Sequence, residues 1–477
     1  MSRSLPMPVK VRPYMHQQAA FDFACGKFGL LPSDSRSRGV ALLMEMGTGK
    51  TMTAIGIAGI LYQFGLASRV LVVAPLSILG VWEEEFANAA AFPYTLTVLK
   101  GTGEKKKKQI REMTGDGLQV LVVNYESARI LEKDLLSYDA DLLIADEGHK
   151  IKEGRTKQSR SMHSLGDRAS YRLLLTGTLI TNKELDVFSE YRFLNSMVFG
   201  KSFYAFRNRY FDMVGYGNHT PRFRQRMMGD FLAKMHSVAY RVTKEECLDL
   251  PEITEEVVPV DLEPKAMKIY QGLERDSFAE LKGGEVTAMN VLTRLLRLSQ
   301  VTGGHITDDE SGEHRISTAK LDALSDVLDS ALEQGQKVVV MARFVPELDD
   351  IEALLNKKKI SYAVVRGGVK DRAAEVAKFQ NDPECRVFVG QIAAAGLGIT
   401  LTAASTMVFY SLDYSMSNFD QAKARIHRAG QTKRCHYIYL TCTGTVDRKV
   451  LRSLRSKVDL AKTLIDDYRR GQNPFRD

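Results

Sequence analysis

The stretch from Leu42 to Thr53, LLMEMGTGKTMT, constrains this chain more than any other part of its sequence. An apolar run at residues 40–44 leads into Gly47-Thr48-Gly49-Lys50-Thr51, and an apolar segment of helical period follows at residues 54–61. A strand, a glycine-rich turn and a helix in this order predict a phosphate-binding loop. Glycines let backbone N–H groups close on phosphate oxygens, and the helix N-terminus adds partial positive charge. We expect Lys50 to reach the β- and γ-phosphates of a nucleotide and the Thr51 hydroxyl to hold Mg²⁺.

The loop departs from the full phosphate-loop pattern at one position. That pattern has a glycine five residues before Gly49, and Met44 stands there. An ordinary strand-to-helix turn is the alternative interpretation. A GxGKT sequence between a strand and a helix disfavours it.

A second motif carries two adjacent carboxylates. Residues 141–149 read DLLIADEGH, so an apolar strand ends on Asp146 and Glu147. In open α/β folds, ligands bind at the carboxyl ends of the strands. There Asp146 would hold Mg²⁺, and Glu147 would orient and deprotonate the attacking water. Two helix-capping acids are the alternative, which the phosphate loop upstream makes less attractive.

Length, charge and cysteine content bound the remaining possibilities. A chain of 477 residues is too long for one ordinary domain, so we expect two or three. The net charge of +8 suits a polyanionic partner. The five cysteines include no CxxC pair and are odd in number, which predicts a reducing compartment and no metal cluster.

Residues 387–412 carry no charge and are long enough to span a bilayer. Glycines, threonines and serines interrupt this stretch, so we interpret it as strand, turn and strand in a buried core. The N-terminal MSRSLPMPVK lacks an apolar segment and is not expected to be a secretion signal.

The second half alternates strands with helices. Strands are expected at residues 337–342, 361–365, 386–390 and 406–410, which predicts a parallel sheet with right-handed crossovers. It contains no second glycine-lysine loop. Instead Arg425 and Arg428 lie three residues apart, on one face of an expected helix. They could act as arginine fingers on a γ-phosphate, and a solvated basic helix is the alternative.

Three weaker signals remain. Gln17 begins a helix upstream of the phosphate loop, and its amide could read an adenine edge. The four lysines at residues 105–108 are expected in a solvated loop. At residues 195–250 aromatic residues alternate with arginines, which suits nucleic acid and the core of a helical insertion equally well.

Together these segments resemble the Swi/Snf-type branch of the superfamily-two helicase-like motors. The motifs arrive in order from Arg12 to Leu454: PYxxQ, the phosphate loop, APLSIL with Trp82, DEGH, LTGT with Asn182, GLGITLTAA and QxxxRxHRxGQ. Two departures are Gly148, where alanine is usual, and Leu179, where proline is usual. Neither removes a catalytic group.

The resemblance implies an α/β protein with two tandem RecA-like lobes, parallel sheets and a helical insertion. The expected lobes are residues 1–250, which bind ATP and include the insertion at about 195–250, and residues 251–477. The resemblance also implies ATP and Mg²⁺ as cofactors and double-stranded DNA, possibly forked, as partner. It assigns adenine to Gln17, nucleotide to Gly47, Thr48 and Gly49, and the link between the DNA and ATP sites to Gly398 and Thr400. The DNA-side positions are Ser77, Arg343, Thr400 and Thr402.

The family implies ATP hydrolysis coupled to stepping along duplex DNA without unwinding it. A strand-separating or fork-remodelling helicase on the same fold is the first alternative. A nucleotide-gated DNA-binding scaffold is the second, and the intact Lys50, Asp146, Glu147, Arg425 and Arg428 argue against it. We expect a monomer without a membrane segment, of minimal bacterial or phage type, in the cytoplasm.

Overall fold

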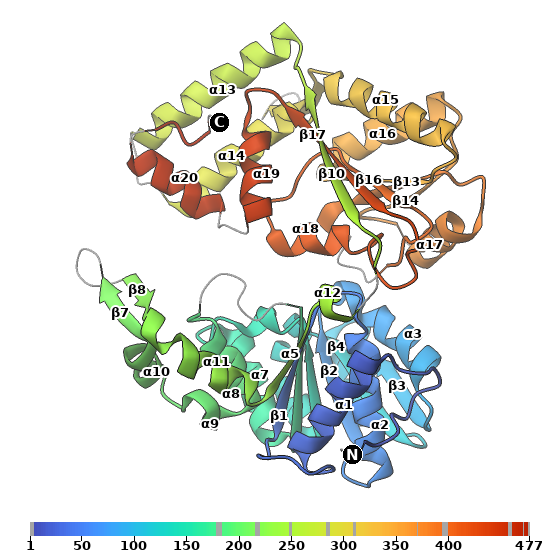
Figure 1. The fold of residues 1–477 in the computed structure, drawn as a ribbon, viewed down its shortest axis with the longest axis vertical. Coiled ribbons are helices and arrows are strands. Elements are labelled where there is room, and N and C mark those ends of the chain that lie inside the picture. The colour runs from blue at the N-terminus through green and yellow to red at the C-terminus, as the bar shows by residue number, and fades with distance from the viewer. Residues whose placement is uncertain are drawn as a thin grey trace. The chain divides into compact units, whose positions relative to one another are not determined.

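The chain forms two compact units, Met1–Asp249 (unit 1) and Leu250–Asp477 (unit 2), each built on its own sheet (Figure 1). This computed structural model describes residues 4–177, 184–214, 220–247, 250–282, 287–308, 312–369, 371–393, 399–456, 460–470 and 472–475. Unit 2 begins close to its edge strand, β10 (Ile253–Val260).

Unit 1 is organised by a seven-stranded sheet in the order β3-β4-β2-β5-β6-β1-β9, in which each neighbouring pair is parallel. Its inner strands are mostly continuous apolar runs, because helices cover both faces of the sheet. They are β1 (Gly39–Met44), β2 (Arg69–Ala74), β3 (Tyr94–Val98), β4 (Leu118–Asn124), β5 (Leu142–Asp146), β6 (Tyr171–Thr176) and β9 (Ala239–Val242).

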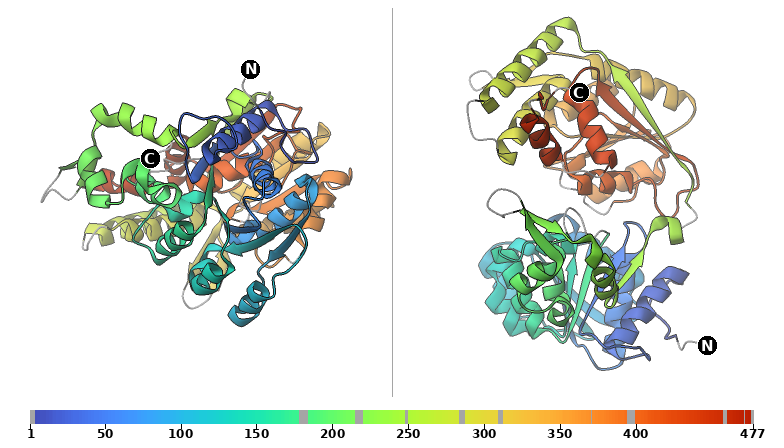
Figure 2. Two further views of the ribbon diagram at one scale, coloured as in Figure 1. Left: turned by 90° about the horizontal axis from the view of Figure 1, so that it is seen from below. Right: turned by 60° about the vertical axis from the view of Figure 1, so that its left-hand side comes forward.

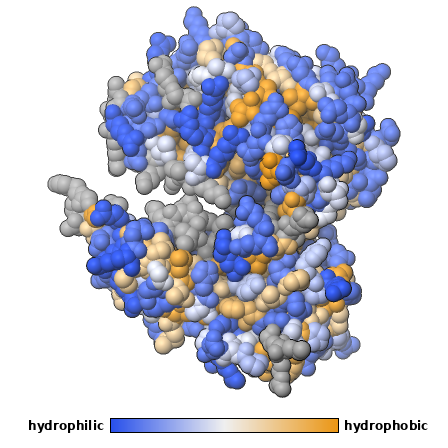
Figure 3. All heavy atoms as spheres, in the orientation of Figure 1, coloured by the Kyte–Doolittle hydropathy of each residue, from blue (hydrophilic) through white to orange (hydrophobic). Residues whose placement is uncertain are grey.

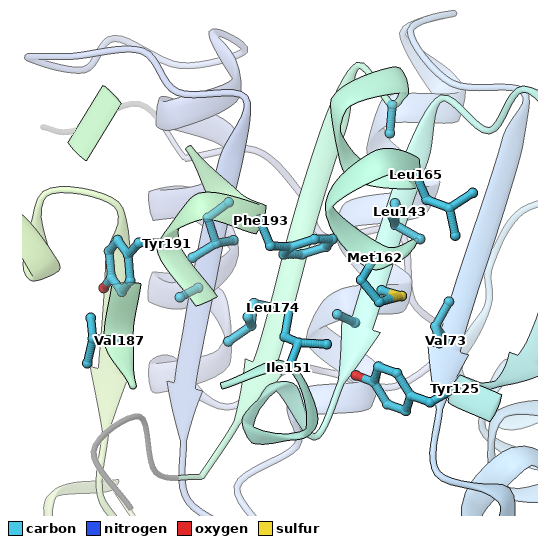
Figure 4. Close-up of a cluster of buried hydrophobic side chains, with 14 of the residues drawn as sticks. Val73, Tyr125, Leu143, Ile151, Met162, Leu165, Leu174, Val187, Tyr191 and Phe193 are labelled. Atoms are coloured by element: carbon cyan, nitrogen blue, oxygen red, sulfur yellow. The ribbon is translucent and has the colours of Figure 1, made fainter. Parts of the chain in front are cut away.

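Two cores lie on the two faces of this sheet. One is formed with α1 (Met15–Phe28), α2 (Lys50–Gln63) and α3 (Leu79–Ala89). The other is formed with α5 (Tyr125–Ile130), α6 (Glu132–Tyr138), α7 (Lys157–Arg168) and α8 (Val187–Leu194). Figure 4 shows Met162 and Leu165 of α7 and Phe193 of α8 packed over the strands that carry Leu143 and Leu174. Short 3-10 turns, η1 (Leu76–Ile78) and η2 (Gly148–Ile151), follow β2 and β5.

The lysine run forms a helix, so the loop expected at residues 105–108 is wrong. Helix α4 (Gly103–Arg111) begins where the Thr102 side chain accepts from the backbone N–H of Lys105. Its one buried side chain, Ile110, anchors it to the core, and the Lys106 Nζ donates to the Ser127 Oγ at 2.6 Å. Ion pairs with Glu104 and Glu112 stabilise the exposed lysines along the helix.

The insertion after α8 is mainly helical and also contains a β-hairpin. Its elements are α9 (Ser196–Phe199), α10 (Phe203–Tyr210), β7 (Phe211–Val214), β8 (Thr220–Phe223), η4 (Gln225–Met227), α11 (Met228–His236) and α12 (Lys244–Cys247). Phe206, Tyr210 and Phe231 are each at most 1% exposed and pack ring against ring. The aromatic residues here therefore support the core interpretation, and β9 returns the chain to the edge of the main sheet.

Unit 2 has a six-stranded parallel sheet in the order β10-β17-β16-β13-β15-β14. The strands after β10 are β13 (Val338–Ala342), β14 (Tyr362–Val365), β15 (Val387–Gln391), β16 (Thr406–Phe409) and β17 (Cys435–Cys442). The two parallel sheets confirm the expected α/β class with two RecA-like lobes.

Helices also cover both faces of this second sheet (Figure 2). One face carries α15 (Ala319–Glu333) and α16 (Val345–Lys357). The other carries α13 (Pro264–Lys282), α14 (Ala288–Thr302), α17 (Arg372–Asn381), α18 (Met416–Lys423), α19 (Val446–Ser456) and α20 (Leu460–Arg469). A hairpin of β11 (His305–Asp308) and β12 (Gly312–Arg315) follows α14.

The uncharged stretch at residues 387–412 lies in this sheet. It supplies β15 and β16, which pair with β13 on its two sides, so the strand–turn–strand interpretation is confirmed. Within the described residues, none of the helices combines the length and apolarity that crossing a membrane requires. Hydrophilic residues cover most of the face of each unit drawn in Figure 3.

The aromatic core of the insertion should stabilise unit 1. We expect Phe231→Ala to cost about 3–5 kcal/mol, because the truncation leaves a cavity among four rings. Urea unfolding followed by tryptophan fluorescence tests this, since the single tryptophan, Trp82, lies in unit 1. Tyr204→Ala is the matched control: Tyr204 is 59% exposed, so its truncation should change stability by under about 0.5 kcal/mol. Equal effects of the two variants would contradict the core assignment.

Candidate functional site

The glycine loop joins β1 to α2 as the sequence predicts. Gly47 and Gly49 have φ of 85° and 89°, a left-handed conformation that side chains rarely adopt. A Cβ at Gly49 would also lie 2.1 Å from Nε2 of Gln17. No side chain caps the α2 N-terminus at Gly49, so its first backbone N–H groups keep the geometry that a phosphate group needs.

Lys50 is the first residue of α2 and turns back along the loop. It is 9% exposed, and its Nζ donates to the backbone oxygen of Met44 at 2.8 Å. The Thr48 hydroxyl donates to the Glu45 oxygen at 2.7 Å, which ties the loop to the end of β1. Thr51, the next residue of α2, is partly exposed. The Lys50 ammonium and the Thr51 hydroxyl therefore both belong to the first turn of α2, directly after the loop.

Gln17 contacts the loop directly. Its Nε2 donates to the Thr48 oxygen at 3.0 Å, and its Oε1 accepts from the Tyr14 N–H at 2.9 Å. The His16 ring nitrogen lies 2.8 Å from the same Thr48 oxygen. The amide is thus held beside the phosphate loop by protein groups, and it could turn to a base only by exchanging one of these bonds.

The paired carboxylates end β5, next to β2 and β6 in the sheet. Asp146 is 5% exposed; its Oδ2 accepts from the Trp82 indole at 3.0 Å and its Oδ1 from the Glu147 N–H at 2.9 Å. The Tyr125 hydroxyl donates to the Asp146 backbone oxygen at 2.7 Å. Burial, and then the neighbouring Glu147, raise the pKa of Asp146 from 3.8 to about 7, against opposing effects of Lys50 and Trp82.

Glu147 occupies a strained backbone position. Its φ of 51° is left-handed, which costs a non-glycine residue free energy and is typical of functional turns. Its Oε2 lies 3.3 Å from Nδ1 of His149. The next residue must be small, because a Cβ at Gly148 would come within 2.4 Å of the Leu174 side chain. The replacement of alanine by Gly148 is therefore required by local packing.

These residues fit Mg²⁺ bound together with a nucleotide. A buried carboxylate with a raised pKa gains from a nearby cation, which favours its ionised form. The described residues contain no group of three or more His, Cys, Asp or Glu side chains that could enclose a metal alone. Mg²⁺ is commonly held by one or two carboxylates plus phosphate oxygens and water. Asp146 and the Thr51 hydroxyl are the residues that could contribute the protein part of such a set.

Arg425 and Arg428 converge in unit 2, but not on a helix as expected. Helix α18 ends at Lys423, and the Arg425 oxygen instead accepts from the Leu401 N–H at 2.9 Å. Gln431 pulls the same segment onto residues 402–404 through its Nε2. The Nη1 atoms of Arg425 and Arg428 lie 3.3 and 3.4 Å from the Ile399 oxygen, so the two guanidinium groups are brought together by long-range contacts.

The other sequence-predicted positions vary in their settings. The Arg343 guanidinium lies 3.8 Å from the centre of the Tyr414 ring, so it is stacked. Thr402 accepts from Gln380 at 3.4 Å, and Thr400 is partly exposed. Gly398 and Asn182 lie outside the described residues, and the side chain of Ser77 is likewise not described.

Three residues that support the site were not predicted as site residues from the sequence. Trp82 lies in α3, after β2, and Tyr125 begins α5, after β4; both donate a hydrogen bond to Asp146. His149 Nδ1 lies 3.3 Å from Oε2 of Glu147. The available signal was the position of Trp82 and Tyr125 just after apolar strands, since the carboxyl ends of parallel strands meet at one edge.

The raised pKa of Asp146 has a consequence for stability. Above its ordinary pKa of 3.8 an unfolded aspartate is ionised, whereas Asp146 in the folded chain stays protonated up to about 7. The free energy of unfolding should therefore fall as pH rises between these values. In Asp146→Asn this fall is absent, so the variant should gain several degrees in Tm over wild type between about pH 5 and about pH 8. Asp116→Asn, at an exposed position, should show a constant difference.

Relatives of this chain were found by sequence and by structure. It is 26% identical to the DNA repair and recombination protein RDH54 of Saccharomyces cerevisiae, over 92% of this chain and 52% of that protein. It is 29% identical to the chromodomain-helicase-DNA-binding protein 1-like of Mus musculus, over 88% and 47%. A solved structure, the Sulfolobus solfataricus SWI2/SNF2 ATPase core in complex with dsDNA, matches with a TM-score of 0.48 and 24% identity, over 95% of this chain and 93% of that one.

The chain spans about half the length of these two curated relatives. Two family models match it in succession. The SNF2-related domain covers residues 24–303, which is more than half of the chain, and the helicase conserved C-terminal domain covers residues 319–430. The chain therefore belongs to the SNF2-related, Swi/Snf-type family of DNA-dependent ATPases.

Proposed function

We propose that this chain hydrolyses ATP and uses the reaction to move along double-stranded DNA. The observation that carries the proposal is the gathering of Lys50, Asp146 and Glu147 at the carboxyl edge of one parallel sheet. The chain spans only about half the length of these curated relatives, so their activities are proposed for it. Unit 1 is proposed as the ATP-binding lobe and unit 2 as the helicase lobe.

In unit 1 each residue has a proposed part. The backbone of Gly47, Thr48 and Gly49 cradles the phosphates, and Lys50 leaves the Met44 oxygen to bind them. Gln17 reads the adenine edge after releasing the Thr48 oxygen. Thr51 and Asp146 hold Mg²⁺, which when bound neutralises charge on the phosphoryl group.

Glu147 is proposed as the general base. Its backbone is left-handed directly after β5 ends, and its Oε2 lies 3.3 Å from Nδ1 of His149. Such a base orients the attacking water and accepts its proton. Trp82 holds the Asp146 carboxylate in place, because its indole N–H donates to the Oδ2 atom.

In unit 2, Arg425 and Arg428 are proposed as arginine fingers that act on the γ-phosphate when the units close during turnover. Their shared contact with the Ile399 oxygen supports a joint role, since both guanidinium groups are held at one place. Gly398 and Thr400 lie in the adjoining segment, which is proposed to link the DNA and ATP sites. Ser77, Arg343, Thr400 and Thr402 remain proposed DNA-side residues.

Double-stranded DNA is the proposed partner. The net charge of +8 favours a polyanion, and RDH54 is named as a DNA repair and recombination protein. We also propose a monomer in a reducing compartment, the cytoplasm of a bacterial or phage-infected cell. All five cysteines are free thiols and four of them are buried, which supports the reducing compartment.

ATP turnover with and without duplex DNA tests the assignment. We expect duplex to stimulate wild type, and Lys50→Ala and Glu147→Gln each to lower stimulated turnover by about 100-fold or more. Arg425→Lys or Arg428→Lys should lower it by about 1,000-fold, the scale of a lost arginine finger. Arg226→Gln, at an exposed position of η4, is the control and should leave turnover unchanged. Full turnover in Lys50→Ala would refute the proposal.

Two further assays separate translocation from its alternatives. Displacement of a triplex-forming strand without separation of a fluorescent duplex is the result expected of a duplex translocase. Separation of a forked duplex would instead identify a helicase. DNA binding without turnover in any assay would identify a nucleotide-gated scaffold. Turnover on duplex, single-stranded and forked DNA and on RNA should be compared at fixed salt, because backbone contacts weaken as salt rises.

A further inference from the structure

Unit 1 contains a basic pocket at the edge of its sheet opposite the phosphate loop. The pocket, with a volume of about 480 Å³, lies where β1 and β6 begin, at residues 39 and 171. Four of its nine lining residues are basic, namely Lys27, Arg36, Arg38 and Arg172, and none is acidic. Since β1 runs from this edge to the glycine loop, the pocket is separate from the proposed ATP site.

Arg172 and Lys27 are the two buried members of the four, each 8% exposed. Lys27 donates to the Ser35 hydroxyl at 2.8 Å, whereas Nε of Arg172 has no hydrogen-bond partner within the described residues. The Arg172 Nη1 reaches the Phe193 oxygen only at 3.5 Å, the limit of a hydrogen bond. A buried guanidinium with an unsatisfied donor is costly, because the group has lost its water without gaining an acceptor.

The charge of Arg172 also lacks a dedicated carboxylate. Burial lowers its pKa first, and Arg38 and Arg192 lower it further. Asp167 opposes this, but both oxygens of Asp167 already accept from Arg192, at 2.8 and 2.7 Å. An anion in the pocket would supply what Asp167 does not.

The two exposed arginines of the pocket are Arg36 and Arg38. Within the described part of the chain, Arg36 and Arg38 have no side-chain hydrogen bond or ion pair. The Arg36 guanidinium lies against the backbone of Gly29, where a Cβ would come within 3.2 Å of its Nε. The Arg38 oxygen accepts from the Arg172 N–H at 2.8 Å, which fixes the two residues side by side.

The walls of the pocket are rigid. The Phe28 and Tyr171 rings pack edge to face at 5.0 Å. The Ser37 hydroxyl donates to the Gly39 oxygen at 2.7 Å and accepts from the Asn195 amide at 3.2 Å. A preformed concave site with converging donors is the usual form of a small-ligand site.

We propose that this pocket binds a compact, multiply charged phosphate ligand, such as a short inorganic polyphosphate or the phosphate groups of a nucleotide. Its oxygens would accept from the guanidinium forks of Arg36 and Arg38, which match phosphate geometry, and its negative charge would offset the buried charge of Arg172, which lines the pocket. A compact ligand is favoured over the backbone of a duplex because Arg172 is recessed.

The test is calorimetric titration of inorganic tripolyphosphate into the full chain carrying Lys50→Ala, which weakens binding at the phosphate loop. We expect saturable binding with a Kd below about 1 mM. Adding Arg36→Gln or Arg38→Gln should weaken it by about 10-fold or more, since each removes a charged hydrogen-bond fork. Arg226→Gln on the same background is the control and should have no effect.

Three outcomes would overturn the proposal. The first is no saturable binding to the Lys50→Ala chain, which would place all phosphate binding at the loop. The second is equal affinity with and without Arg36→Gln and Arg38→Gln. The third is a short DNA duplex whose affinity depends on these arginines while that of tripolyphosphate does not. Because Arg36 and Arg38 are exposed, an unchanged urea midpoint by Trp82 fluorescence will confirm that the variants are folded. The outcome is independent of whether the chain translocates on DNA.

Discussion

Two adjacent carboxylates, Asp146 and Glu147, at the end of a buried strand determine which groups must surround the candidate site of unit 1. Asp146 is nearly enclosed, and its charge is disfavoured by that burial and by Glu147. Asp146 accepts hydrogen bonds from the Trp82 indole, the Glu147 N–H and the Tyr125 hydroxyl. The nearby charge of Lys50 also favours its ionised form. Such a site is preorganised for a cation, since ionised Asp146 gains most when positive charge arrives.

The parallel sheet explains why these groups meet. The glycine loop follows β1, η1 and Trp82 follow β2, Tyr125 follows β4, and the acidic pair ends β5. Parallel strands deliver all of these to one edge, although they are far apart in the chain. The opposite edge gathers the starts of β1 and β6, and there the arginines of the basic pocket meet without acids among them.

Unit 2 reaches its site by a different route. Residues 424–430 form turns, and their conformation is fixed by Gln431, which donates to the oxygens of Thr402, Ala404 and Ile426. The arginines therefore take their positions from residues 399–404, about 25 positions upstream. A single buried amide thus connects residues 402–404 to the turns that carry the two arginines.

The sequence alone predicted the strands that lead into the phosphate loop and the acidic pair, and those at residues 337–342, 361–365, 386–390 and 406–410, because short apolar runs between polar turns are typical of buried strands. It did not predict β10 or β17. The sequence also indicated the phosphate loop and the acidic pair, because the residues that define each motif lie within a few positions of one another. The tertiary structure decided the remainder. Helix α4 forms because Thr102 caps it and the Ile110 side chain is buried in the core. The segment that contains Arg425 does not continue helix α18, because Leu401 and Gln431 hydrogen-bond it to residues 401–404. The basic pocket joins residues 27–38, 170–172 and 195, and local pattern carries no information about side chains that meet only after folding.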